Sequence, residues 1–224
     1  MRSLYIEVGA VLLGLAGAAN AATLVTYDIQ NANAANGSLA PASVAAGATA
    51  TDLTLNGLGG AYNYTGSFAG TGWSAAKDSA RYIGFDVAPT SGNMITYGTV
   101  TYGVLSDANA PAGPRNFELR ASTDGFATST LLDSFSMEGY GGVVQTGIDI
   151  SALGTQTGNV AFRLFAFNGS DSKFAGLIGY DVESNLAING TVAAVPEPAS
   201  FALLCLGGLA VFGRRVRVRK TGQG

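Results

Sequence analysis

The chain of 224 residues contains no histidine, and its single cysteine, Cys205, lies close to the C-terminus. Without histidine there can be no Ser-His-Asp triad, no imidazole ligand for zinc and no imidazole that shuttles protons near neutral pH. With one cysteine the chain cannot form an internal disulfide, so its stability has to come mainly from a hydrophobic core. These absences exclude most catalytic classes, and we expect a protein that is not an enzyme.

Charged residues are also scarce, at 12% of the chain, and they are unevenly distributed. Five of the twelve Lys and Arg residues lie within positions 214–220, whereas residues 22–195 hold six cations against thirteen Asp and Glu. This body therefore has a net charge near −7, although the whole chain has −3. Because nucleic acids and anionic lipids are bound through clustered Lys and Arg, the distribution predicts that the body binds neither.

The C-terminal segment has three parts. Pro196, Glu197 and Pro198 come first, and the two prolines hold the backbone extended and accessible. An uncharged run follows at 199–213, somewhat shorter than the roughly twenty residues of a typical transmembrane helix. The basic cluster that ends the segment comprises Arg214, Arg215, Arg217, Arg219 and Lys220. Since such clusters stay on the cytoplasmic side, we expect a transmembrane helix with the body outside the membrane.

This order of motif, apolar run and basic end resembles the PEP-CTERM sorting signal of exported Gram-negative bacterial proteins. The resemblance implies that an exosortase, a membrane cysteine protease-transpeptidase, cuts near the motif. It also implies that the inner membrane holds the protein transiently before delivery to the cell surface or the extracellular matrix. An association with extracellular polysaccharide and biofilm rests on this resemblance alone.

The N-terminal segment predicts export. Arg2 supplies a positive charge, residues 8–18 are apolar, and Ala19 and Ala21 form a small-x-small cleavage site before residue 22. A signal peptide at 1–21 agrees with a tail whose body lies outside the membrane. Between the two ends, residues 22–194 are expected to form one domain, followed by the sorting signal at 195–224.

Short segments with period-two alternation, separated by glycine-rich turns, recur along the body. In 81–87, Ile83, Phe85 and Val87 alternate with outward residues, which predicts a half-buried strand. In 94–105 the alternation changes phase, which predicts a bulge near Gly98. Further strands are expected at 24–29, 115–122, 131–137, 143–150, 159–167 and 186–192, with 159–167 central and 30–50 a long loop.

Eight to ten such strands without an amphipathic helix predict an all-β fold. We expect an antiparallel β-sandwich of jelly-roll type, flanked by the N-terminal signal helix and the C-terminal transmembrane helix.

Three uses of the body remain open. Trp73, Tyr62 and Tyr64 could stack sugar rings, although a core position for the tryptophan is the more typical one. Asp107 and Asp124 could bind calcium, but both resemble turn formers. Asp181 and Glu183 could serve as the two carboxylates of a hydrolase, although no other feature of the sequence requires hydrolase activity. No cofactor is expected apart from that calcium option, and the alternative to a surface protein is a carbohydrate-binding module, with or without calcium.

Overall fold

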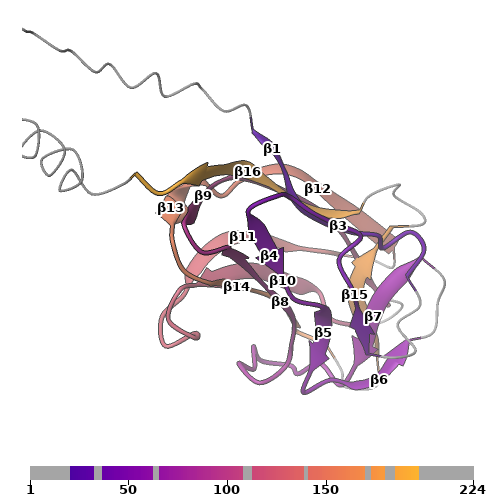
Figure 1. The fold of residues 1–224 in the computed structure, drawn as a ribbon. Helices are drawn as coiled ribbons and strands as arrows, with labels where there is room; N and C mark the ends of the chain where they lie inside the picture. Colours follow the sequence, from indigo (N-terminus) through magenta and orange to yellow (C-terminus); the bar gives the residue numbers. More distant parts are fainter. Residues whose placement is uncertain are drawn as a thin grey trace, which may run out of the picture.

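The computed structural model describes residues 21–32, 37–62, 66–107, 113–138, 141–169, 173–179 and 185–196. They form two antiparallel sheets that pack face to face, and Figure 1 shows the sheets as two layers. This confirms the predicted all-β sandwich. The expected signal peptide and transmembrane helix lie outside the described residues.

The first sheet is organised around one long strand, β9, which pairs with β16, β12, β13 and β15. Opposite β9, Asn189 pairs with Thr99 and Gly190 pairs with Tyr97, so Gly98 is an extra residue. The predicted bulge is therefore confirmed. The strands of this sheet are β1 (Ala22–Tyr27), β3 (Ser43–Val44), β6 (Gly59–Tyr62), β7 (Ser67–Thr71), β9 (Asn93–Ser106), β12 (Gly141–Asp149), β13 (Thr155–Gln156), β15 (Ala175–Ile178) and β16 (Leu186–Ala194).

The second sheet has the order β11-β10-β14-β8-β5-β2, and β4 also pairs with β8. As predicted, β14 is a central strand, because it pairs with β10 on one side and β8 on the other. The strands of this sheet are β2 (Ser38–Leu39), β4 (Ala48–Ala50), β5 (Leu53–Asn56), β8 (Tyr82–Pro89), β10 (Asn116–Ser122), β11 (Thr130–Ser136) and β14 (Val160–Phe167). The chain crosses repeatedly between sheets, from β8 to β9 to β10 and again from β12 through β13 to β14 and β15, as jelly-roll chains do.

The core lies between the two sheets and is rich in aromatic contacts. Tyr27 of the first sheet packs edge-on against Phe85 of the second, with ring centroids 5.1 Å apart. Tyr97 of the first sheet packs in a tilted arrangement against Phe162, with ring centroids 5.8 Å apart, and Phe162 itself stacks on Phe85. The two sheets are thus held together mainly by apolar burial, as a chain without disulfides requires.

Two parts of the sequence prediction were wrong. Residues 30–50 are not one long loop, because β2, β3 and β4 lie within them. These short strands are held by backbone hydrogen bonds, such as the one from the N–H of Ala45 to the carbonyl of Leu24, and need no large side chain to bury. The described residues also contain sixteen strands rather than eight to ten, since β6, β7, β13 and β15, like β2, β3 and β4, were not predicted.

Candidate functional site

The solvent-facing side of the second sheet carries an open groove of about 610 Å³, which we call the outer groove. Its floor comes from β8 and β14. Ile83 and Phe85 of β8 are buried in the core, so the alternate residues Tyr82, Gly84 and Asp86 face the groove. The flanks come from β5 with the residues before it and from the turns after β10 and β13. The neutral polar residues that line it are Thr51, Thr54, Asn56, Ser122, Thr123, Gln156 and Asn159.

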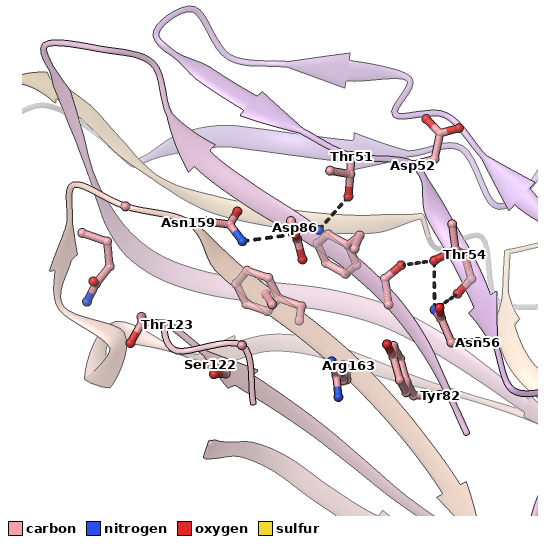
Figure 2. A pocket seen from close by; sticks show the side chains of 17 residues that line it. Thr51, Asp52, Thr54, Asn56, Tyr82, Asp86, Ser122, Thr123, Asn159 and Arg163 are labelled. Carbon is pink, nitrogen blue, oxygen red and sulfur yellow. Dashed lines mark hydrogen bonds between the residues drawn. The ribbon is translucent and has the colours of Figure 1, made fainter. Parts of the chain in front are cut away.

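One end of the outer groove is organised around Asp86. Its backbone N–H donates to Thr51 Oγ1 at 2.9 Å, and Asn159 Nδ2 donates to its Oδ2 at 3.1 Å (Figure 2). None of the described residues donates a hydrogen bond to the other carboxylate oxygen. Asp86 is therefore oriented by its neighbours and still has one oxygen that can accept from a ligand.

The flank on β5 presents an amide. Asn56 Nδ2 donates to Thr54 Oγ1 at 2.9 Å, and Thr54 Oγ1 donates to the carbonyl of Gly84 at 3.2 Å (Figure 2). This chain of hydrogen bonds fixes the Asn56 side chain over the edge of the groove. Amides and hydroxyls held in this way both donate and accept, which suits a ligand rich in hydroxyl groups.

The other end of the groove holds a cation between two aromatic rings. The Arg163 guanidinium carbon lies 4.0 Å from the ring centroid of Tyr82 and 3.8 Å from that of Phe126, both of which are cation–π distances. Phe126 reaches this position from the turn after β10 with a φ of 69°, a conformation that is uncommon outside glycine. Gly84 makes room for the Tyr82 ring, since a Cβ at Gly84 would lie 2.8 Å from Tyr82 Cε2.

Trp73, one of the three residues of the predicted sugar-stacking platform, lies in the core. Trp73 is 0% exposed, and its indole N–H donates to the carbonyls of Gly70 and Ala175 at 2.8 and 3.1 Å. It fills the core, as the more typical interpretation held, because those two carbonyls give its polar atom buried partners. The side chain of Tyr62 and the whole of Tyr64 lie outside the described residues.

The two calcium candidates are not brought together. Asp107 follows β9 next to the start of β10, where Lys173 Nζ lies 3.2 Å from its Oδ2. Asp124 follows the other end of β10, so the seven residues of that strand, roughly 20 Å, separate the two carboxylates. In the part of the chain that the structure describes, no group of three or more Asp, Glu, Cys or His residues could hold a metal ion.

Asp124 organises the turn between β10 and β11. Its carboxylate accepts the Thr128 hydroxyl at 2.6 Å, the Thr128 N–H at 3.0 Å and the Ser122 hydroxyl at 2.7 Å. These hydrogen bonds, those from Thr128 first, lower the pKa of Asp124 from 3.8 to about 2. Turn formation is thus the role in which the structure places this residue.

The shifted pKa predicts a pH dependence of stability. Because the folded pKa lies below the unfolded value, the contribution of the Asp124 carboxylate is complete above about pH 4 and is lost as the pH falls towards 2. In urea unfolding, the free-energy difference between wild type and Asp124→Asn should therefore shrink between pH 6 and pH 2. Glu138→Gln, which removes an exposed carboxylate just after β11, controls for the loss of one negative charge. A difference for Asp124→Asn that stays constant over this range would contradict the prediction.

The sorting motif begins directly after the last strand. The N–H of Val195 donates to the carbonyl of Gly92 at 2.9 Å, and both Val195, 41% exposed, and Pro196 lie at the surface. The described chain ends at Pro196. The remaining predicted residues, which are Glu197, Pro198, the basic cluster at 214–220 and Ala19 of the cleavage site, lie outside the described residues, whereas Ala21 is exposed directly before β1.

The sequence prediction did not identify the outer groove. Its residues come from segments that lie far apart in the chain, and each of them occupies an ordinary outward position of a strand or turn. The available signal was Arg163, the one charged residue in the otherwise apolar segment 159–167. A cation facing out of a central strand marks a position on the open face of the sheet.

The fold and the outer groove define a β-sandwich protein with a polar site on one sheet. Its C-terminal segment carries a sorting motif. Residues 194–220 match the family model described as the PEP-CTERM protein-sorting motif. The chain is thus a protein with a PEP-CTERM sorting domain, and the motif implies export and processing by an exosortase.

The other comparisons are weak. No curated protein matches the chain at a significant level. Among solved structures, a variant of Xylanase10C from Cellvibrio japonicus in complex with xylopentaose aligns with 11% sequence identity and a TM-score of 0.37. The alignment covers 68% of this chain and 28% of that chain, and at this TM-score it carries no argument about function.

Within the described ranges, no helix has the length and apolar character needed to cross a membrane.

Proposed function

We propose that the chain is a non-enzymatic protein of the cell surface or extracellular matrix, delivered there through its PEP-CTERM signal and associated with extracellular polysaccharide. The observation that carries the proposal is the match of residues 194–220 to the sorting motif, directly after the sandwich. Pro196 is exposed where the strand β16 has ended, so a protease can reach the motif without unfolding the domain.

The chemistry of the body supports a binding role over a catalytic one. The outer groove holds two carboxylates, those of Asp52 and Asp86, and each already accepts a hydrogen bond, from Ser38 and Asn159 respectively. With no histidine in the chain, no imidazole can serve as general base. We therefore assign the groove to ligand binding.

Mass spectrometry of the exported protein tests the sorting part of the proposal. We expect a mature form that has lost the residues before Ala22 and the apolar run and basic cluster of the tail. An intact tail on a soluble secreted form would refute exosortase processing.

A second candidate function is a carbohydrate-binding module, and the outer groove is the observation that favours it. Its volume and its lining of amides, hydroxyls and one tyrosine are suited to a sugar polymer that crosses the sheet. Calcium bound at the turns could assist such binding. Comparing retention on polysaccharide in the presence of calcium and of a chelator distinguishes calcium-dependent from calcium-independent binding.

Replacing Asn56 and Asn159 together by Ala should weaken polysaccharide binding by about tenfold, since each amide supplies hydrogen bonds of roughly 0.5–1.5 kcal/mol. The measurement is retention of the full chain on immobilised polysaccharides. Ser134→Ala is the matched control, because Ser134 is exposed on β11, outside the residues that line the groove. Equal retention of the double variant and the control would contradict a role of the groove.

A further inference from the structure

Three of the six cations of the body converge on the outward face of the second sheet. Lys77, Arg120 and Arg163, which we call the cationic cluster, line a hollow of about 290 Å³ with Phe126 and Phe165. Arg163 lines both this hollow and the outer groove, so the two depressions adjoin. The net negative charge of the body conceals this local excess of positive charge.

The register of the strands places two of these cations directly opposite each other. Arg120 of β10 pairs with Arg163 of β14, which pairs in turn with Gly84 of β8 and, through it, with Thr54 of β5. Like charges at directly opposed positions are destabilising. Arg120 and Arg163 therefore repel each other in the folded protein, and an anion bound between them would stabilise this arrangement.

The carboxylate within the cluster does not neutralise it. Glu118 Oε2 lies 2.8 Å from both Lys77 Nζ and Arg120 Nη1. Burial alone would raise the pKa of Glu118, but the hydrogen bonds from these two cations outweigh it and lower the pKa. One ionised carboxylate is thus shared by two cations, and with Arg163 the cluster keeps an excess of two positive charges.

Arg163 lies beside two aromatic rings. Its guanidinium carbon lies over the rings of Tyr82 and Phe126 (Figure 2 shows Arg163 beside Tyr82). Among the described residues, none forms a hydrogen bond or ion pair with its N–H groups. Cation–π contacts hold the guanidinium in place without using its N–H groups, which can donate two parallel hydrogen bonds to a carboxylate.

We propose that the outer groove and the cationic cluster together bind an acidic polysaccharide, with the carboxylate of a uronic acid unit on Arg163 and Arg120 and neutral hydroxyl groups along the amides of the groove. This rests on the proposed association with polysaccharide and names its chemical class. A uronate fits because it joins a carboxylate to a ring of hydroxyls. The carboxylate matches the cationic end of the depression, and the hydroxyls match the amides, hydroxyls and the carboxylates of Asp52 and Asp86 in the adjoining groove, all of which can form hydrogen bonds with hydroxyl groups.

The test is binding of the full chain, purified in detergent, to polygalacturonate and to its methyl-esterified form, which has the same backbone without the charge. We expect tighter binding of the charged polymer, and weakening of that binding by salt. Arg163→Gln should lower the affinity for polygalacturonate by about tenfold to a hundredfold, as expected for a lost charge-assisted pair. Arg115→Gln, which removes the same charge just before β10, should change it far less.

Each other outcome overturns the inference in a distinguishable way. Equal binding of the two polymers, unaffected by Arg163→Gln, would refute recognition of a carboxylate and leave polysaccharide binding in place. Binding of neither would refute both, while mass spectrometry still tests sorting separately. Displacement by single-stranded RNA at equal charge would refute a polysaccharide as the ligand. If Arg163→Gln does not fold, Arg120→Gln replaces it, and unchanged affinity of that variant overturns the inference.

Discussion

Replacing Gly176 by alanine is expected to destabilise the protein strongly. On β15, Gly176 pairs with Ala69 of β7, and a Cβ at Gly176 would lie 2.4 Å from the Ala69 Cα and from the Phe68 carbonyl oxygen. These are backbone atoms, so the clash can be relieved only by moving one strand away from the other. Since β15 is flanked by β7 and β9, that movement breaks the sheet, and we expect a loss of roughly 4 kcal/mol, a large part of a typical unfolding free energy.

The measurement is urea unfolding followed by the emission of Trp73, the single tryptophan, which is buried in the folded state. Gly158→Ala is the matched control, because a Cβ at Gly158 meets nothing within 4 Å, and we expect it to change stability by less than about 0.5 kcal/mol. If Gly176→Ala is as stable as Gly158→Ala, the close approach of β15 and β7 is wrong.

Replacing Pro196, Glu197 and Pro198 together by alanine is expected to leave the protein uncut in the inner membrane. The alanines remove the two prolines that hold the backbone extended and the carboxylate that can accept a charge-assisted hydrogen bond from the protease. The apolar run and the basic cluster are unchanged, so membrane insertion should persist with the body outside. Cell fractionation with detection of the body should show the protein in the membrane and little release.

Ala193→Ser is the control for this experiment, because Ala193 is exposed near the end of β16 and lies outside the residues 194–220 that match the sorting motif. It should be processed like wild type. Equal release of wild type and the triple variant would refute recognition of the motif and leave the anchor in place.

Much of the fold could be predicted from local alternation. Ile83, Phe85 and Val87 were predicted to face inward and are buried, because a strand with one face in the core must alternate whatever it pairs with. The phase change around Gly98 was likewise visible, since a bulge shifts the inward parity by one residue.

The strands that were missed have no such pattern. β15 reads Ala-Gly-Leu-Ile and is buried on both faces, and β7 is built largely from small residues. Their sequence reflects the close approach at Gly176 rather than a period of two, and that approach exists only once the sheet has formed. The outer groove was missed for a related reason, since the register that places Arg163 opposite Gly84, and Gly84 opposite Thr54, is a property of the paired strands and not of any one segment.

The position of β16 in the first sheet also determines how the domain bears a mechanical load. β16 lies between β1 and β9, antiparallel to both, and the tail leaves from its C-terminal end. A pull on the tail, while a polymer holds the opposite sheet, is directed along this strand. It loads the hydrogen bonds to β1 and β9 in shear, many at once, instead of peeling them one after another. A domain tethered through a central strand resists being drawn apart far better than one tethered through an edge strand.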